Sequence, residues 1–417
     1  MEALLFLVHR IPYPPTKGDK IRSYHILKHL ARSYRIHLGA FVDDPADWRY
    51  KARLEAMCAS VCLLPLRPLQ AKLRSLSGLA GNSALSLPYF RKQKMQRWID
   101  STLMRDDVRR LFVYSSPMAQ YVAGKKYASL RRIVDFVDVD SDKWRQYAQR
   151  KSWPLSWLYR REGERLLGFE SRVARTFDAS IFVSAAEADL FRRLAPEAAE
   201  RVCFMDNGVD FTYFSPEREY ENPYKDQSDV LVFTGAMDYW ANIDAVRWFA
   251  LEVFPQVRQS IPSARFVIAG SRPTRDVLQL ASLPGVSVTG AVVDIRPYLA
   301  HASAAVAPLR IARGVQNKVL EAMAMAKPVL ATPSAVEGIE YDNPVGLQVS
   351  DSGHQLAEMA IRLLQQDRLQ PIRASREWVC QRYDWDINLG RMHELFEGLS
   401  DQPGTCPETM QLVADNE

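Results

Sequence analysis

Residue types that bind phosphate and sugar groups lie within nine positions of one another, from Arg313 to Glu321. Gly314 lets a loop approach a ligand closely, and a helix predicted to start at about Asn317 presents unpaired backbone N–H groups with partial positive charge. Lys318 adds a second cation, and Glu321 lies at i+4 from Asn317, so both side chains can face the loop. Backbone donors, two cations and a carboxylate suit a ligand with a diphosphate at one end and sugar hydroxyls beside it.

The segments around this loop follow the pattern of a parallel α/β sheet. Residues 303–308 form a short apolar run typical of a buried strand, residues 317–326 form an apolar helical run, and residues 328–332 form a second β-branched run. Short apolar runs alternate with amphipathic stretches along the rest of the chain in the same way. The sequence therefore predicts an α/β protein in which the Gly314 loop joins a strand to a helix.

Other candidate ligand-binding residues follow earlier strands of the same half, and among them Arg272 is placed to approach an anion. Gly235, Arg272 and Gly290 each come after an apolar run, and Asp294 starts the helix after Gly290. Ligands of open α/β sheets bind beyond the carboxyl ends of the strands, where these loops are expected to gather.

A second candidate loop follows the first apolar run of the chain, LLFLV at 4–8. Its prolines forbid a helix, and Gly18 precedes a helical pattern that starts at about Lys20. A strand, a glycine-containing loop and a helix form the usual anion site of an α/β domain, and Lys17 adds positive charge there. An ordinary strand-to-helix turn explains Lys17, Gly18 and Asp19 equally well, and both interpretations stay open.

Aspartates cluster where the apolar run at 131–137 ends. Asp138 and Asp140 form a DxD pair, which is able to hold a divalent metal on a nucleotide diphosphate. In a second interpretation one aspartate faces an interdomain cleft and orients a substrate hydroxyl. In a third, these carboxylates cap the next helix. The sequence alone leaves the three open, and we favour Asp138 as the cleft residue, without a metal.

The size and composition are those of a soluble two-domain protein. The chain has 417 residues, of which 47% are hydrophobic and 25% charged. No apolar run approaches the ~20 residues of a membrane span, and LLFLV is too short for the core of a signal peptide. The five cysteines are few and odd in number, which favours reduced thiols in the cytoplasm.

The charge is divided unevenly along the chain. Residues 1–205 hold 36 Lys and Arg against 21 Asp and Glu, whereas the remainder holds 18 against 28. Basic and aromatic residues are mixed at 89–99 and again at 144–170, as in segments that lie on an anionic membrane surface. Both segments are equally consistent with helices that pack their apolar faces inward. A nucleic-acid partner is disfavoured because no recognised binding module accompanies the charge.

A polar stretch without periodicity separates the two halves, and the predicted organisation follows from it. The predicted segments are an N-terminal Rossmann-like domain at 1–210, a linker at 211–228, a second Rossmann-like domain at 229–375, a helix at 376–399 that returns to the first domain, and a disordered tail at 400–417.

Several motifs together resemble the two-domain GT-B glycosyltransferases of the large GT4-like group. They are PPTKGD, VSAAEADLF, NGVDFTYF, FTGAMDYWANIDAVRWF, VTGAVVDIRPYL and NKVLEAMAMAKPVLAT, spread over about residues 1–395. HRIPYPPTKGDKIRSYH, VDVDSDKW and RGVQNKVLEAMAMAKPV are most similar to the sugar transferases associated with bacterial exopolysaccharide and exosortase (PEP-CTERM) loci.

The resemblance implies two Rossmann-like domains facing across a cleft, with the nucleotide-sugar donor mainly on the second. Glu321 matches the second acidic residue of the family's E-x7-E motif, which is expected to hold the donor ribose. The first acidic position is Arg313 here, so its role does not carry over. The Arg and Lys that often follow the second domain's first strand are absent after Gly235, and we infer that Arg313, Lys318 or Arg272 supplies that charge.

The predicted site follows from the resemblance and the loops together. We expect Arg313 and Lys318, with the loop N–H groups, to bind the departing diphosphate, and Asp138 to orient the acceptor or sugar. We expect Glu321 to bind the ribose and Lys17, Gly18 and Asp19 to shape the acceptor side. The remaining predicted donor-binding residues are Gly235, Arg272, Gly290, Asp294, Gly314, Val315, Gln316 and Asn317.

The expected activity is transfer of a sugar from a nucleotide-diphosphate sugar to a glycan or polyprenyl-diphosphate-linked acceptor, in bacterial exopolysaccharide or cell-surface polysaccharide synthesis. The family implies retention of configuration; we expect neither metal nor cofactor. Location would be cytoplasmic, with peripheral binding to the inner face of the plasma membrane. A GT-B-fold nucleotide-sugar epimerase and a non-catalytic partner of polysaccharide assembly are the alternatives.

Overall fold

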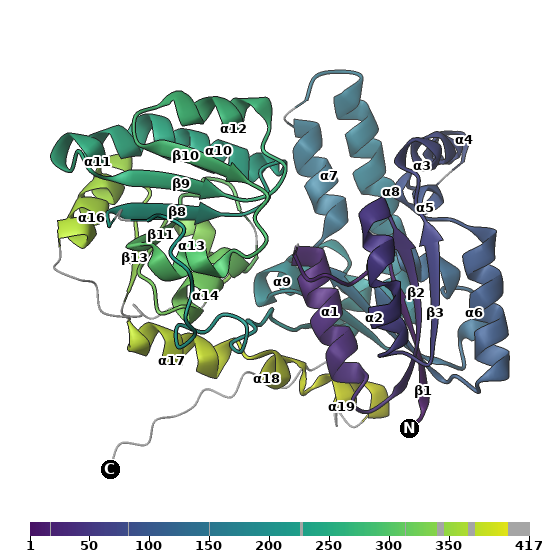
Figure 1. The fold of residues 1–417 in the computed structure, drawn as a ribbon. Helices are drawn as coiled ribbons and strands as arrows, with labels where there is room; N and C mark the ends of the chain where they lie inside the picture. Colours follow the sequence, from purple (N-terminus) through teal and green to yellow (C-terminus); the bar gives the residue numbers. More distant parts are fainter. Residues whose placement is uncertain are drawn as a thin grey trace, which may run out of the picture. The chain divides into compact units, whose positions relative to one another are not determined.

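The computed structural model describes residues 1–16, 18–81, 83–149, 151–225, 228–312, 314–339, 346–365 and 372–398. The chain divides into two units (Figure 1). The first unit comprises Met1–Asp206 together with the chain from Leu389 onward, and the second comprises Asn207–Asn388. Two predicted site residues, Lys17 and Arg313, lie outside the described residues, as does the predicted tail at 400–417.

The first unit is built on a seven-stranded sheet with the order β3-β2-β1-β4-β5-β6-β7, in which every neighbouring pair is parallel. Every residue of β1 is buried, because helices cover both faces of such a sheet. The strands are β1 (Ala3–Val8), β2 (Arg35–Val42), β3 (Ser60–Pro65), β4 (Arg110–Tyr114), β5 (Arg131–Val137), β6 (Ala179–Phe182) and β7 (Val202–Phe204).

Helices connect these strands. They are α1 (Gly18–Leu30), η1 (Pro45–Tyr50), α2 (Lys51–Glu55), α3 (Pro68–Ser75), α4 (Ser77–Ala80), α5 (Ser86–Tyr89), α6 (Gln93–Arg105), η2 (Ser116–Tyr121), η3 (Lys125–Tyr127), α7 (Asp140–Gln149), α8 (Leu155–Thr176), α9 (Ala185–Leu194) and η4 (Pro196–Arg201). Ser184 caps α9, because its hydroxyl accepts a hydrogen bond from Glu187 N at 3.3 Å.

The two basic aromatic segments of the first unit have different surroundings. At 89–99, α6 turns its apolar face inward, with Met95 and Ile99 fully buried, so the inward-packing interpretation is correct there. At 144–170 the chain forms the hairpin of α7 and α8 (Figure 1). Trp144 packs inside that hairpin on Tyr159, whereas Trp153 and Trp157 are exposed. None of the described helices is both long and apolar enough to cross a membrane.

The second unit repeats the architecture with a six-stranded parallel sheet, in the order β10-β9-β8-β11-β12-β13. Its strands are β8 (Val230–Thr234), β9 (Arg265–Ala269), β10 (Val286–Gly290), β11 (Ala304–Ala307), β12 (Val329–Ala331) and β13 (Leu347–Val349). Its helices are α10 (Trp240–Trp248), η5 (Phe249–Val253), α11 (Phe254–Ser260), α12 (Arg275–Gln279), η6 (Leu280–Ser282), α13 (Arg296–His301), α14 (Asn317–Ala324), α15 (Pro333–Val336), α16 (Gly353–Gln365), α17 (Arg373–Arg382) and α18 (Trp385–Leu389).

Two details of the second unit are not apparent from the sequence. Asn242 lies inside α10, which begins at Trp240, and its amide donates to Ala236 O at 2.9 Å. The helical segment from Trp240 to Ser260 is interrupted by a π-helical turn at Phe249–Val253. Phe249 and Val253 are both fully buried, so the extra residue of this turn is accommodated within the core.

The end of the described chain consists of three short helices where we predicted one crossover helix at 376–399. They are α17, α18 and α19 (Met392–Glu397). Residues 389–398 belong to the first unit, where Arg131 Nη2 donates to Leu395 O at 2.8 Å and Arg110 Nη2 pairs with Glu397 at 2.9 Å. Upstream, Phe214 and Tyr224 from the predicted linker are buried in the core of the second unit.

Candidate functional site

The second sheet changes direction between β8 and β11. The strand order runs outward from β8 to β9 on one side and from β11 to β12 on the other. In open α/β sheets this switch point is where ligands bind, because the loops after the two central strands diverge there. The loop with Gly314 follows β11, and Gly235 follows β8, so the two predicted loops meet at this point.

Lys318 joins the two loops at the switch point. It belongs to the first turn of α14, and its Nζ donates to Asn242 Oδ1 at 2.7 Å and lies 4.0 Å from the centre of the Phe233 ring. A Cβ atom added at Gly235 would lie 3.2 Å from this Nζ. The ammonium of Lys318 therefore lies beside the backbone after β8, where the family's Arg and Lys are absent from this sequence.

The carboxylate of Glu321 lies one turn along α14 and shares this environment. Desolvation raises the pKa of Glu321 to about 7, against the opposing charge of Lys318. Desolvation likewise lowers the pKa of Lys318 to about 7, with Glu321 opposing the shift. Both side chains are partly exposed. An acid and a base whose pKa values are moved toward neutrality in a loop cluster are typical of a ligand site.

Close backbone contacts hold the loops around these two side chains. A Cβ atom at Gly270 would lie 1.7 Å from Gly235 O, so the loops after β8 and β9 touch through bare backbone. A Cβ atom at Gly338 would lie 2.5 Å from the carbonyl carbon of Gly314, whose φ of 63° suits glycine. These backbone contacts hold the Gly314 loop and the loop after β8 in position at the carboxyl ends of the strands.

The remaining residues of the Gly314 loop lie at the start of α14. Val315 is buried, whereas Gln316 and Asn317 are partly exposed. Gln316 Nε2 donates to Gly314 O at 3.3 Å, and Asn317 Oδ1 accepts from Asn207 Nδ2 at 3.4 Å. The helix α14 begins at Asn317, as the sequence predicts, so the unpaired N–H groups of its first turn lie next to this loop.

The other predicted donor residues lie after β9 and β10. Arg272 has a φ of 55° and is about half exposed, and its Nη1 lies 3.5 Å from Asp238 Oδ2. Gly290 ends β10 with a φ of 71°. Asp294 pairs with Arg296, from Nη2 to Oδ2 at 2.6 Å, and also accepts from the Tyr213 hydroxyl at 3.4 Å. The Asp294 carboxylate is therefore held within the protein, and the exposed backbone beside it is what remains for a ligand.

The first sheet has its own switch point, between β1 and β4, and the Asp19 loop lies there. Asp19 is in the first turn of α1, pairs with Arg10 and lies 3.5 Å from His9 Nε2, while His9 Nδ1 lies 3.4 Å from Ser115 Oγ. Burial would raise the pKa of Asp19, but the hydrogen bond from His9 and the charge of Arg10 hold it well below its ordinary value. Gly18 is the first residue of α1, and no atom lies within 4 Å of a Cβ placed there.

Asp138 lies after β5, at the same edge of the first sheet. Lys143 Nζ is 2.6 Å from Asp138 Oδ2 and 3.3 Å from Asp140 Oδ1, so an ammonium bridges the two carboxylates of the DxD pair. Burial would lower the pKa of Lys143, but the two carboxylates raise it above its ordinary value. Within the described ranges, no group of three His, Cys, Asp or Glu side chains is placed to hold a metal ion.

Sequence reasoning missed three polar partners at these two edges. Asn242, His9 and Ser115 are not among the predicted site residues. His9 directly follows the first strand, which is a usable signal, because the carboxyl end of a central strand is where α/β sites collect. Ser115 follows β4, the other strand of the switch point, and only the strand order identifies it.

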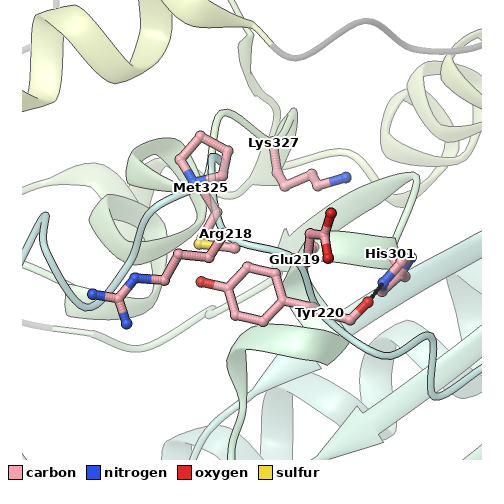
Figure 2. A pocket seen from close by; sticks show the side chains of 8 residues that line it. Arg218, Glu219, Tyr220, His301, Met325 and Lys327 are labelled. Carbon is pink, nitrogen blue, oxygen red and sulfur yellow. Dashed lines mark hydrogen bonds between the residues drawn. The ribbon is translucent and has the colours of Figure 1, made fainter.

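A separate cavity of about 450 Å³ opens at the opposite edge of the second sheet. Figure 2 shows Tyr220 at its centre, with His301 donating to Tyr220 O at 2.7 Å. Ala300, His301 and Lys327 precede β11 and β12, so this cavity lies at the amino ends of the strands, whereas the Gly314 loop lies at their carboxyl ends. The cavity is therefore distinct from the predicted donor loops.

The comparison with protein families fits this second sheet. Residues 228–366 match the family model described as Glycosyl transferases group 1. The second unit thus resembles a group 1 glycosyltransferase domain. The match includes the Gly235 loop, Lys318 and Glu321. No curated protein sequence is similar enough to this chain to count as a match.

Solved structures match the chain over nearly its whole length. The Anabaena protein HepE, solved in complex with UDP and glucose, is 16% identical, with 95% of this chain and 100% of HepE covered and a TM-score of 0.66. Sucrose-phosphate synthase from Thermosynechococcus elongatus is 16% identical, with 96% and 99% covered and a TM-score of 0.65. WaaG, a glycosyltransferase involved in lipopolysaccharide biosynthesis, is 16% identical, with 95% and 100% covered and a TM-score of 0.62.

These likenesses establish the fold. The two parallel-sheet, Rossmann-like units have the GT-B architecture, and the predicted fold class is confirmed.

Proposed function

We propose that this protein is a glycosyltransferase that moves a sugar from a nucleotide-diphosphate sugar to a hydroxyl of a glycan or lipid-linked acceptor. The observation that carries the proposal is the placement of Lys318 at the switch point of the second sheet, beside Gly235 and next to Glu321. Support also comes from the group 1 match over residues 228–366 and from HepE, which was solved with UDP-glucose.

The proposed chemistry uses charge and position. The bond between the anomeric carbon and the β-phosphate oxygen breaks, the diphosphate takes the electron pair, and the acceptor oxygen forms the new bond and gives up its proton to the departing diphosphate. Lys318 and the N–H groups at the start of α14 stabilise the charge that develops on the diphosphate, and the loss of one such donor typically costs ~3 kcal/mol. Glu321 accepts hydrogen bonds from the ribose. Arg313 is proposed to add charge at the same loop.

The acceptor side is proposed to lie on the first unit, where Asp19 and Asp138 follow the carboxyl ends of the strands. Asp138 orients the acceptor or the sugar from its ion pair with Lys143. No cofactor or metal takes part in the proposal, because Lys143 already bridges the DxD carboxylates. Activity that survives EDTA is expected, and a loss restored by Mg²⁺ or Mn²⁺ would return the DxD pair to a metal role.

The biological setting is proposed from the motif resemblance. We assign the reaction to the assembly of bacterial exopolysaccharide or another cell-surface polysaccharide, in the group associated with exosortase (PEP-CTERM) loci. The protein would act in the cytoplasm at the inner face of the plasma membrane, on a polyprenyl-diphosphate-linked acceptor. Retention of anomeric configuration is part of the same proposal, and the anomeric coupling constant of the product measures it directly.

The deciding experiment has two parts. Purified protein is incubated with a panel of nucleotide sugars, beginning with UDP-glucose, and a membrane extract, and the products are identified. Calorimetry with the donor so identified then compares the wild-type protein with Glu321→Gln, which keeps the shape of the side chain. Transfer by the wild type and weaker donor binding by the variant are expected. Absence of turnover with every donor, or unchanged donor affinity in Glu321→Gln, would overturn the activity or the ribose assignment respectively.

A further inference from the structure

Two helices of the first unit turn an apolar face outward. Leu69, Leu73 and Leu76 lie at i, i+4 and i+7 along α3 and its end, and their exposed fractions are 78%, 69% and 55%. Leu79 of α4 continues the row three residues later. This spacing is that of one helix face, which in a soluble protein normally packs on the core. Here the residue of α3 that faces the core is Ala71, which is fully buried.

The tip of the α7–α8 hairpin carries a second exposed apolar group. Trp153 is 80% exposed, Trp157 55% and Leu155 46%. Of the large apolar side chains that are exposed in the described part of the chain, seven belong to these two segments. They are Leu69, Leu73, Leu76, Leu79, Trp153, Leu155 and Trp157. We call these seven residues the apolar ridge.

Arg161 and Glu162 hold the two segments that carry the ridge next to each other. Arg161 Nη2 donates to Gly78 O at 2.6 Å and to Gly81 O at 2.8 Å, which ties the second turn of α8 to the end of α4. The buried Glu162 carboxylate accepts from Ser86 N, at the first residue of α5, at 3.0 Å. These bonds hold α8 against the segment that carries the leucines, and Figure 1 shows α3 and α4 beside α8.

The charge within the two segments of the ridge has a single sign, and the nearest exposed carboxylate further along α8 is Glu164. Residues 66–83 contain three Lys and Arg and no Asp or Glu, and residues 150–161 contain four Lys and Arg and no Asp or Glu. Among them Arg67, Lys72, Lys151 and Arg160 are exposed. Exposed Trp and Leu beside Lys and Arg, without acidic residues, complement the surface of an anionic lipid bilayer, where Trp occupies the headgroup region and each cation attracts acidic lipids.

We propose that the apolar ridge docks the protein on an anionic membrane surface, with Trp153, Trp157 and the leucines of α3 entering the headgroup layer. This inference rests on the proposed function, because an acceptor that is bound to the membrane gives the protein a reason to bind there. It also relocates the membrane contact, since α6, the first basic amphipathic candidate, buries its apolar face in its own unit.

The test is flotation of the full-length protein with lipid vesicles. One set of vesicles contains only phosphatidylcholine, and the other contains phosphatidylglycerol as well. Binding to the anionic vesicles is expected to be the stronger. Trp153→Ser with Trp157→Ser, and separately Leu69→Ser with Leu73→Ser, should weaken that binding by at least about tenfold, because each removes large side chains from the lipid. Leu251→Ser with Leu278→Ser, two exposed leucines of the second unit, is the matched control and should bind as the wild type does.

A variant that removes charge separates electrostatic attraction to acidic lipids from insertion of the apolar side chains into the bilayer. Lys72→Gln with Lys151→Gln should weaken binding to the anionic vesicles by about fivefold per charge and leave binding to phosphatidylcholine unchanged. Donor affinity, measured by calorimetry, should be the same in every variant, so a failure of the ridge and a failure of the proposed activity give different results.

Three outcomes would overturn the proposal. The first is that neither kind of vesicle carries the protein to the top of the gradient. The second is that the ridge variants and the control float equally well. The third is a dimer in light scattering that the ridge variants dissociate, because the occupant of the ridge would then be a second copy of the chain.

Discussion

Lys318, at the carboxyl edge of the second sheet, is held differently from the cations at the carboxyl edge of the first sheet. In the first unit cations are paired with carboxylates, as in Arg10 with Asp19 and Asp43, and Lys143 with Asp138. In the second unit Lys318 donates to the neutral amide of Asn242, and Glu321 is the carboxylate whose charge acts on it.

This difference indicates what each edge is built to receive. A paired edge presents little excess charge and suits a neutral partner such as a sugar hydroxyl. At the second edge desolvation opposes both charges, so the pKa values of Lys318 and Glu321 move toward each other, to about 7. Under the proposed function, an incoming diphosphate would stabilise the ammonium and so offset the free energy that desolvation costs this charge in the free protein. The comparison is tested below by breaking a pair on the first edge and the charge on the second.

The largest effect is expected from the buried pair of Arg22 and Asp135 in the first unit. Both side chains are almost fully buried, and Arg22 Nε lies 2.8 Å from Asp135 Oδ2. Arg22→Met leaves the carboxylate buried without its partner, which should lower the free energy of unfolding by about 3–5 kcal/mol. Chemical denaturation measures this change.

The matched control replaces both members, as Arg22→Met with Asp135→Leu, and should regain most of the lost stability because no charge remains buried. A single variant as stable as the wild type would show that this paired charge does not hold the first unit together.

The next effect concerns Lys318 in the second unit. Lys318→Gln keeps a hydrogen-bond donor but removes the charge, and donor affinity should fall by about 10–100-fold, the range of hydrogen bonds to charged groups. Calorimetry with the nucleotide-sugar donor measures it. Lys327→Gln, at the opposite edge of the sheet, is the control and should bind the donor as the wild type does. Equal affinities for Lys318→Gln and the wild type would remove this ammonium from the site.

A smaller and graded effect is expected from pH. The free protein loses the Lys318 ammonium as the pH rises above about 7, because desolvation lowers its pKa to about 7. A bound diphosphate raises that pKa again, so binding takes up a proton and affinity falls with rising pH. Calorimetry from about pH 7 to about pH 9 measures the slope, over a range in which the phosphodiester groups of the donor do not titrate. Lys318→Arg keeps its charge there and should give a shallower profile, to which Glu321, with a pKa of about 7, still contributes; a flat wild-type profile would contradict the assignment.

The smallest effect is expected from Arg272. Its side chain is about half exposed and its guanidinium is 3.5 Å from Asp238, so water screens most of its interaction with a ligand. Arg272→Ala should weaken donor binding by less than about fivefold, which corresponds to ~1 kcal/mol. A larger loss would move Arg272 into direct contact with the diphosphate and make it, together with Lys318, a replacement for the missing Arg and Lys.

Much of the fold could be predicted from the sequence because each buried parallel strand is a short apolar run. The run at 131–137 coincides with β5, and the runs at 4–8, 303–308 and 328–332 differ from β1, β11 and β12 by one residue at one or both ends. The π-helical turn at Phe249–Val253 was not predictable in this way. An inserted residue in a helix leaves the apolar composition unchanged, and only the packing of Phe249 and Val253 on the core reveals it.

The part of the candidate site that consists of residues close in sequence was predictable. Lys318 and Glu321 lie one turn apart on α14, so the spacing alone places them together. Asn242 and Lys318 are 76 positions apart and meet only because β8 and β11 are adjacent in the sheet. His9 and Ser115 likewise meet through the pairing of β1 with β4. Long-range strand order decides these contacts, and no local pattern encodes it.

The contact of Gly235 with Gly270 has a consequence for how the second unit changes in evolution. Main chain rests on main chain there, with no room for a Cβ atom at Gly270. A single substitution at Gly270 cannot change the shape of this backbone contact without moving the ends of β8 and β9 apart. Such a movement would disturb the fold before it altered any contact with a ligand. A saturation library should therefore show near-complete intolerance at Gly270 beside free variation at exposed neighbours such as Val293. Under the proposed function, a new donor preference would then have to arise from substitutions of exposed side chains in the loops, while the backbone contact of Gly235 with Gly270 stays the same.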